Sequence, residues 1–520
     1  MTEKKNIVLA ALSGVLLTCA FPKVGWDWLA WMALVPLLFA LKDLSAGRAF
    51  RTGFIAGLVH FLSLLYWLVP VMRTYGYLPA YLSVSVLFIF AAFLALFIAS
   101  FSAALTMLAQ KPAWCLTLTP LLWVSLEFIR SFLFSGFPWE LLGYSQYHRL
   151  QLIQISDILG VYGLSALIAL ANGAIFITLL YFTGRRWQNS AISKRLAAGS
   201  FIALFAGVAL TLSYGHWRMK EIDKLIAAAP KARIAVVQGN IDQLVKWDPA
   251  FQIATIKKYN RLSASLSQQR PDLIVWPESA APFYFFYDMK PTELVFEGID
   301  QTKTDYLIGS PSFVRNGNSV EYYNSAYLIS PAAKTWAKYS KTHLVPFGEY
   351  VPFKRWLPFL GKIVAQVGDF RAGSKGRTLA WRDQQLGIQI CYEIIFPGLS
   401  RAMVRNGAAL LINITNDAWF GKTSGPYQHF SMTIFRAVEN RRALARSANT
   451  GISGFIDPAG RILASTELLQ EAAATKTLPL MQENSIYTRI GDLFAMGCLA
   501  LAVLGMLVEL AWGKIKRRKD

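Results

Sequence analysis

Runs of apolar residues divide the chain into three parts. Long apolar stretches, separated by short polar loops, run from Asn6 to Tyr214, and one more runs from Ile490 to Trp512. Between them, residues 231–483 alternate short apolar runs with polar segments, as in a water-soluble domain. Because a helix needs about 20 mostly apolar residues to cross a bilayer, the pattern predicts a membrane part, a soluble part and a closing membrane segment.

Eight apolar stretches are candidate transmembrane helices: 6–21, 28–41, 54–71, 81–109, 112–134, 158–182, 196–214 and 490–512. The second is short and would lean on its neighbour. Lys4 and Lys5 before the first stretch would also suit a signal peptide. More apolar stretches follow at once, however, and this favours a retained helix. The predicted domains are 1–215 (seven helices), 230–484 (soluble) and 488–513 (last helix), followed by a basic tail, 514–520.

The soluble part alternates β-rich runs with helical segments. Strands are expected at 234–238, 273–276, 306–309, 325–329, 387–390 and 410–414, and helices at 249–268 and 427–448. This order predicts a layered α/β domain. In such domains functional side chains gather where strands end and open into loops.

Composition agrees with a membrane protein, and the distribution of charge gives its orientation. The chain is 54% hydrophobic, and 16% of its residues are charged, against about 25% in soluble domains. Its formal net charge of +21 raises the question of nucleic acid, but we find no nucleic-acid-binding motif. With eight crossings, most of the loop charge lies on one side: Lys4, Lys5, Lys42, Arg48, Arg51, Lys111, Arg185, Arg186, Lys194, Arg195 and the tail.

Positive loops mark the cytoplasmic side of a membrane protein. We therefore predict a multi-pass protein of the bacterial inner membrane with both termini in the cytoplasm. The soluble part would then lie on the periplasmic side.

One cysteine lies in the soluble part, Cys391, and it follows the expected strand Gly-Ile-Gln-Ile. A lone cysteine is more often structural, but a thiol with a nearby base is a strong nucleophile. Glu278, after Leu-Ile-Val-Trp-Pro, could accept the proton, and the Lys341 ammonium could stabilise an oxyanion. Spacing alone does not show that these groups meet.

The surrounding motifs carry a family resemblance. Trp-Pro-Glu at 276–278, Lys-Thr-His-Leu-Val-Pro-Phe-Gly-Glu-Tyr-Val-Pro at 341–352 and Cys-Tyr-Glu at 391–393 resemble the nitrilase (carbon–nitrogen hydrolase) superfamily. Within it, these motifs, with Asn-Asp-Ala-Trp-Phe at 416–420 and Arg-Ser-Ala-Asn-Thr-Gly at 446–451, resemble the apolipoprotein N-acyltransferases over nearly the whole chain. The resemblance implies an α-β-β-α sandwich together with a helical membrane domain of about eight helices.

The resemblance also implies a two-step (ping-pong) acyl transfer. The sn-1 acyl chain of a phospholipid such as phosphatidylethanolamine would pass to Cys391 as a thioester. It would then pass to the α-amino group of an S-diacylglyceryl-cysteine at a lipoprotein N-terminus, the third step of lipoprotein maturation. Glu278 would be the base and Lys341 the oxyanion donor, in a monomer without metal or dissociable cofactor. Supporting and substrate-binding positions would be Glu349, Tyr392, Glu393, Trp247, Asn324 and Trp419.

Several alternatives remain open on the sequence. A membrane-anchored amidase or nitrilase would pass the acyl group to water, and an inactive lipid-binding scaffold would not react at all. The apolar stretches 282–287 and 351–359 suit either lipid contact or a core. Trp247 could pack or bind, and His343 would be a structural hydrogen-bonding residue. The helical spacing of Arg436, Glu439, Arg442 and Arg446 favours surface ion pairs.

Overall fold

The computed structural model describes residues 3–331, 335–352 and 369–517 of the chain. They form two compact units. One comprises residues 1–218 together with 490–520, and the other comprises residues 219–489. Each unit is described by itself below.

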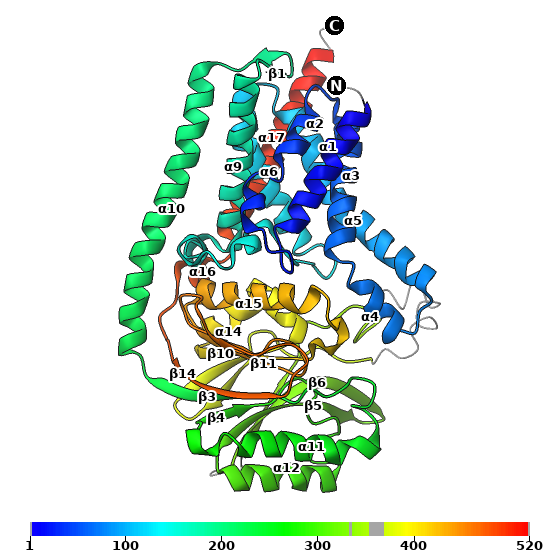
Figure 1. Ribbon diagram of the computed structural model, residues 1–520, viewed down its shortest axis with the longest axis vertical. Coiled ribbons are helices and arrows are strands. Elements are labelled where there is room, and N and C mark those ends of the chain that lie inside the picture. Colours follow the sequence, from blue (N-terminus) through cyan, green and yellow to red (C-terminus); the bar gives the residue numbers. More distant parts are fainter. Residues whose placement is uncertain (1–2, 332–334, 353–368, 518–520) are drawn as a thin grey trace. The chain divides into compact units, whose positions relative to one another are not determined.

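The first unit is helical. Its main helices are α1 (Glu3–Cys19), α2 (Val35–Leu41), α3 (Ala46–Leu64), α4 (Leu68–Thr74), α5 (Ala80–Leu108), α6 (Pro112–Arg130), α9 (Val161–Phe182), α10 (Lys194–Ala228) and α17 (Leu493–Arg517) (Figure 1). Short helical turns η1 (Asp27–Trp31), η2 (Leu142–Gln146), α7 (Leu150–Ile153) and α8 (Ser156–Leu159) and a small hairpin, β1 (Arg186–Trp187) with β2 (Ser190–Ala191), connect them.

Small residues let the helices of this unit approach closely. A Cβ atom added at Gly14 of α1 would lie 2.5 Å from the Ala56 carbonyl oxygen of α3. One added at Gly53 of α3 would lie 2.2 Å from Ser102 Oγ of α5. Such glycine contacts are typical of helix packing in membranes, where van der Waals contact replaces the hydrophobic effect.

Several of these helices are long and apolar enough to cross a membrane. Within the described residues five qualify, namely α5, α6, α9, α10 and α17, and a sixth forms if α3 and α4, bent by 51°, are one span. The expected stretch 6–21 is the 17-residue α1, and 28–41 is divided between η1 and α2. The unit is therefore compatible with a membrane domain, while eight crossings stay a prediction.

The second unit contains two six-stranded sheets. The first has the order β14-β3-β4-β5-β6-β7 and the second the order β13-β12-β11-β10-β9-β8. Each has parallel strands at its centre and antiparallel strands at its edges. The strands are β3 (Lys231–Gln238), β4 (Leu273–Val275), β5 (Asp305–Asn316), β6 (Ser319–Ser330), β7 (Thr335–Ser340), β8 (Thr378–Trp381), β9 (Gln384–Ile390), β10 (Ala408–Thr415), β11 (Ala443–Ala448), β12 (Gly454–Ile456), β13 (Ile462–Ser465) and β14 (Ala472–Pro479).

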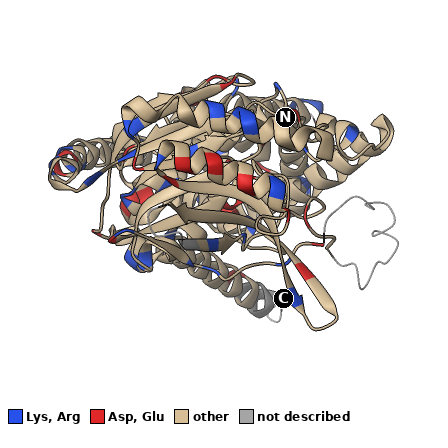
Figure 2. Cartoon of the chain, turned by 90° about the horizontal axis from the view of Figure 1, so that it is seen from below, with Lys and Arg blue, Asp and Glu red and all other residues tan. Residues whose placement is uncertain are grey.

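Helices cover the outer faces of both sheets. Helices α11 (Pro249–Ala264) and α12 (Met289–Thr302) lie on the first sheet, and α14 (Pro397–Arg405) and α15 (Gly425–Asn440) lie on the second (Figure 1). Lys, Arg, Asp and Glu residues line α11 and α12, as expected of a layer that faces water (Figure 2). The result is the expected α-β-β-α sandwich.

The two sheets meet where their central strands end. Ser447 Oγ on β11 lies 3.0 Å from the carbonyl oxygen of Val237 on β3 and 3.0 Å from that of Val275 on β4. The carboxyl ends of the parallel strands of both sheets are thereby held together. This arrangement brings loops that are distant in sequence to one place.

The expected helix at 427–448 is wrong in its second half. Helix α15 ends at Asn440, Arg441 adopts a left-handed φ of 51°, and β11 begins at Ala443. The expected surface ion pairs are also wrong, because Arg436, Glu439, Arg442 and Arg446 are all buried. Arg436 pairs with Glu439 at 2.9 Å inside the domain.

The aromatic stretch 282–287 is largely core. Phe283 and Phe285 are 3% and 2% exposed and belong to the same buried cluster as Trp276, Val295 and Tyr327. These two rings therefore pack in the core of the domain, and lipid contact does not explain them. The second apolar stretch, 351–359, lies outside the described residues from position 353 onward.

Candidate active site

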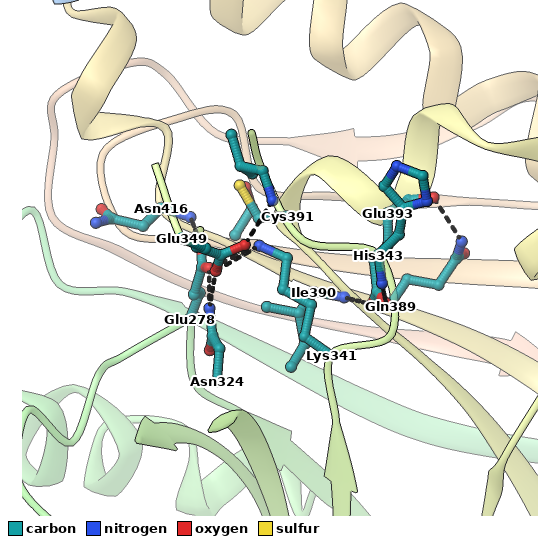
Figure 3. A network of polar contacts seen from close by, with 12 residues as sticks. Glu278, Asn324, Lys341, His343, Glu349, Gln389, Ile390, Cys391, Glu393 and Asn416 are labelled. Atoms are coloured by element: carbon teal, nitrogen blue, oxygen red, sulfur yellow. Dashed lines mark hydrogen bonds and ion pairs between the residues drawn. The ribbon is translucent and has the colours of Figure 1, made fainter. Parts of the chain in front are cut away.

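The three residues predicted to carry the chemistry come together at the strand ends of the second unit. Glu278 follows β4, Lys341 follows β7 and Cys391 follows β9 (Figure 3). Of the supporting residues, Glu349 lies beside them on the loop after Lys341, and Asn324 lies in β6. The loops that the sequence placed at strand ends therefore form one site.

Lys341 lies between two carboxylates. Its Nζ is 3.0 Å from Glu349 Oε1 and 3.6 Å from Glu278 Oε1. Lys341 is 1% exposed. Burial acts to lower the pKa of Lys341, but the charges of Glu349 and Glu278 outweigh it and raise the pKa. The side chain is therefore a permanent cation at neutral pH.

Further hydrogen bonds fix both carboxylates. Asn324 Nδ2 donates to Glu278 Oε1 and to Glu349 Oε1, each at 2.8 Å. The other oxygens accept from main-chain amides, Glu278 Oε2 from Asn416 at 2.9 Å and Glu349 Oε2 from Val345 at 2.9 Å. This saturation holds Glu278 in one orientation at the edge of the thiol site.

Cys391 begins the short turn η4 (Cys391–Ile395) with a left-handed φ of 54°. A non-glycine residue in this region is uncommon and marks a backbone held in place by its surroundings. Burial raises the pKa of the Cys391 thiol, and the charge of Glu278 raises it further, while Lys341 and a hydrogen bond from Thr415 lower it. A thiol in this setting needs a base at the moment of reaction.

Glu393 accepts hydrogen bonds from main-chain amides of two segments of the site. Its Oε1 accepts hydrogen bonds from the amides of Thr342 (2.6 Å) and His343 (3.1 Å), and its Oε2 accepts from the amide of Ile390 (2.7 Å). Tyr339 Oη donates to both oxygens at 3.0 Å. Glu393 thus ties the loop that carries Lys341 to the strand that carries Cys391.

The aromatic positions differ in exposure. Tyr392 is partly buried and packs edge-on against Phe396, with ring centroids 5.1 Å apart, and His343 contacts the same ring. Trp247 and Trp419 are 47% and 38% exposed. Both side chains are therefore partly accessible at the surface of the domain.

A charged network lies behind Cys391. Asp417 Oδ2 pairs with Arg446 at 2.7 Å, and its Oδ1 is 3.0 Å from His429 Nδ1. Asn413 Nδ2 donates to the Cys391 carbonyl at 3.4 Å, and Arg446 bonds Asn413. Burial acts to raise the pKa of Asp417, but Arg446 and His429 outweigh it and hold the pKa well below its usual range.

The sequence analysis missed one charged residue of the site, Lys246. It is 1% exposed, and its Nζ donates to the main-chain carbonyl of Glu278 at 3.0 Å. The available signal was a lysine between apolar residues in Leu-Val-Lys-Trp, next to Trp247. Within the described residues, no group of three or more His, Cys, Asp or Glu side chains could hold a metal ion.

Comparison with known proteins extends over both units. A family model for the apolipoprotein N-acyltransferase N-terminal domain matches residues 13–174, and the carbon-nitrogen hydrolase model matches residues 233–484. A Geobacter metallireducens protein named apolipoprotein N-acyltransferase is 45% identical over 502 residues, covering 96% of this chain and 94% of its own. A protein of the same name from Chlorobaculum tepidum is 32% identical, covering 97% and 96%. An amidase from Nesterenkonia sp. of known structure is 22% identical, covers 51% of this chain and 95% of its own, and has a TM-score of 0.35.

The sandwich and its family match define the second unit as a nitrilase-like domain. The helical unit that accompanies it carries the match to the N-terminal acyltransferase domain. The chain belongs to the apolipoprotein N-acyltransferase family. It is an acyltransferase that acts on lipoproteins and is associated with a membrane.

Proposed function

We propose that this enzyme moves the sn-1 acyl chain of a phospholipid to the α-amino group of an S-diacylglyceryl-cysteine in two steps through Cys391. The observation that carries the proposal is that Glu278, Lys341 and Cys391 lie at one strand-end site within a chain of this family (Figure 3). The donor would be phosphatidylethanolamine or a similar phospholipid. The enzyme would act as a monomer, and its residues supply the chemistry without a cofactor.

In the first step the Cys391 thiol gives its proton to Glu278, and the sulfur attacks the ester carbonyl. The ammonium of Lys341 stabilises the tetrahedral oxyanion, which is the role that a buried cation performs best in a site without water. The intermediate collapses, and the lysophospholipid alkoxide leaves with the proton held by Glu278. The products are a thioester on Cys391 and a free lysophospholipid.

In the second step a neutral amine attacks the thioester. Glu278 takes the excess proton from the attacking nitrogen, Lys341 again stabilises the oxyanion, and the thiolate leaves. The proton on Glu278 returns to the sulfur, and an amide has formed. Because Glu278 alternates between base and acid, its fixed position between Asn324 and the Asn416 amide supports the same role in both steps.

We further propose that both termini are cytoplasmic and that the nitrilase-like domain lies on the periplasmic side of the inner membrane. With the eight crossings predicted from the sequence, the basic loops lie on one side, and this supports the orientation. Lipoprotein N-termini and phospholipid would then be available to the same site. A membrane-anchored amidase or nitrilase would keep the same three residues but would not need so large a helical unit, and the family match likewise favours transfer over hydrolysis.

The test is mass spectrometry of the purified enzyme after incubation with phospholipid. We expect an acyl mass on the peptide containing Cys391 and none in Cys391→Ala or Cys391→Ser. Cys19→Ala, Cys115→Ala and Cys498→Ala are the matched controls and should keep the adduct. Addition of a diacylglyceryl-cysteine peptide should move the acyl mass to its amine. Release of free fatty acid in place of acylated peptide would instead identify an amidase-type hydrolase.

A further inference from the structure

Lys246 is a buried lysine whose ammonium bonds a main-chain carbonyl and forms no ion pair within the described residues. It is 1% exposed, and its Nζ makes a hydrogen bond to a neutral acceptor, the Glu278 carbonyl, at 3.0 Å. Within the described part of the chain, no carboxylate lies at ion-pair distance from it. A buried ammonium without an ion partner is costly, and proteins seldom keep one without a use for it.

The surroundings of Lys246 identify that use. The titratable groups that face its ammonium are Glu278 and the Cys391 thiol, and Lys341 faces Glu278 from 3.6 Å. Burial lowers the pKa of Lys246 to about 8, although the charges of Glu278 and Cys391 act to raise it. The ammonium thus bonds the main chain of the proposed base, and its charge interacts with the proposed nucleophile.

The hydrogen bond from Lys246 also reaches a strained part of the backbone. The residue after Glu278, Ser279, has a left-handed φ of 51°. Gly309 packs against this turn so closely that an added Cβ would lie 2.7 Å from Glu278 Cα. An ammonium that bonds the Glu278 carbonyl therefore helps to hold the base in place.

We propose that Lys246 is a positioning residue of this active site: it holds the main chain of Glu278 through its carbonyl, and its positive charge favours the thiolate of Cys391. The site then has two cations with different duties. Lys341 contacts the carboxylates directly and serves the oxyanion, whereas Lys246 acts on the thiol and base from the loop 241–248. The inference rests on the proposed function for its place in the reaction. Its effect on the thiol can be measured without any lipid.

The experiment is the rate of Cys391 alkylation by iodoacetamide against pH, followed by peptide mass spectrometry on the full-length enzyme in detergent. Removing the cation in Lys246→Met should raise the thiol pKa, so that alkylation at pH 7, where Lys246 of the parent is charged, slows about tenfold. Lys246→Arg keeps the charge and should react within about threefold of the parent. Lys258→Met is the matched control, because Lys258 also bonds a carbonyl, that of Gly239, but is paired with Glu471.

Each outcome decides the inference. Equal alkylation by Lys246→Met and the parent would overturn it, as would equal slowing in Lys246→Met and Lys246→Arg, because shape and not charge would then matter. If Lys246→Met does not fold, the inference is tested by comparing the alkylation profiles of the parent and Lys246→Arg. Above pH 8 the parent rate should rise less steeply than that of Lys246→Arg, whose guanidinium stays charged. Parallel profiles would contradict the inference.

Failure of the proposed function is recognised separately. If the parent forms no acyl adduct from phospholipid but the alkylation pattern is as expected, the two-step transfer is wrong and the role of Lys246 in setting the thiol stands. If the adduct forms but the alkylation rate does not change in Lys246→Met, the two-step transfer stands and the role of Lys246 is wrong.

Discussion

Asn324 and Lys341 together hold two carboxylates that would otherwise repel each other. The Oε1 atoms of Glu278 and Glu349 accept from the same amide nitrogen, and Lys341 lies between them. The positive charge of Lys341 offsets the repulsion between the two carboxylates. The charge of Glu278 raises the pKa of the Cys391 thiol, and the proposed reaction requires proton transfer from that sulfur to the carboxylate.

The first prediction separates the charge of Glu278 from its action as a base. Because Glu278 raises the pKa of the Cys391 thiol, Glu278→Gln should not slow alkylation at fixed pH and can accelerate it. Thioacylation by phospholipid should nevertheless fall by about 10²–10⁴, the usual contribution of a general base. The two rates are measured on the same preparation, alkylation with iodoacetamide and thioacylation in a single turnover.

Lys341→Met is expected to differ from Glu278→Gln in its alkylation rate. Lys341 lowers the pKa of the thiol, so the loss of its charge should slow alkylation, and thioacylation should fall by about 10²–10³ or more for the missing oxyanion donor. If Glu278→Gln instead thioacylates like the parent, the base is another residue, and Glu349 is the next candidate. If Lys341→Met keeps full thioacylation, the oxyanion donor lies elsewhere.

At the scale of elements, buried polar and charged side chains behind Cys391 join α15, β11 and η5 (Asp417–Phe420). Asp417, His429 and Arg446 come from three different elements and contact one another. Arg446 also bonds Asn413, whose side chain reaches the Cys391 carbonyl. The network thus supports the backbone of Cys391 from the interior of the domain.

The second prediction concerns this network. Asp417→Asn removes the anion that pairs with buried Arg446, and breaking one partner of a buried pair typically costs about 3–5 kcal/mol. The midpoint of thermal unfolding of the nitrilase-like domain, followed by tryptophan fluorescence in detergent, should therefore fall. The matched control is Glu471→Gln, which breaks partly exposed pairs with Lys258 and Arg261 and should cost about 1 kcal/mol or less. Equal melting of Asp417→Asn and the parent would mean that the network is not needed for stability.

The same elements show what the sequence could and could not predict. Alternating apolar runs located six of the strands correctly, and Glu278, Lys341 and Cys391 were found because they follow such runs. The end of α15 was missed because Arg441 takes the left-handed position that glycine normally marks. The arginines after it were mistaken for surface residues because their partners come from distant segments, and helical spacing carries no information on tertiary burial. Lys246 was missed for the same reason, since its partner lies 32 residues away.

At the scale of the whole molecule, the apolar pattern predicted correctly that this unit is helical. The predicted number of membrane-spanning helices, eight, is not confirmed. Helices α5, α6, α9, α10 and α17 correspond to expected spans. Helix α10 extends to Ala228, well past the expected end at 214. Its 35 residues give a length of about 50 Å, more than the ~30 Å of a hydrocarbon core. The length of α10 could not be predicted from hydropathy, because hydropathy marks only the apolar stretch. The helical backbone continues beyond it through polar residues.

The last prediction is the orientation of the chain in the membrane. Arg185 and Arg186 lie in the loop between α9 and α10, and basic loops of this kind stay in the cytoplasm. Alkaline phosphatase, which is active only outside the cytoplasm, should therefore be inactive when fused after Arg186 and active when fused after Ala229, which follows α10. Green fluorescent protein at the C-terminus should fluoresce, because the basic tail is predicted to be cytoplasmic. The two phosphatase fusions differ only by α10, so each controls for the expression of the other. An inactive fusion after Ala229 with an active one after Arg186 would invert the topology, placing the nitrilase-like domain in the cytoplasm and contradicting the proposed access to lipoprotein N-termini.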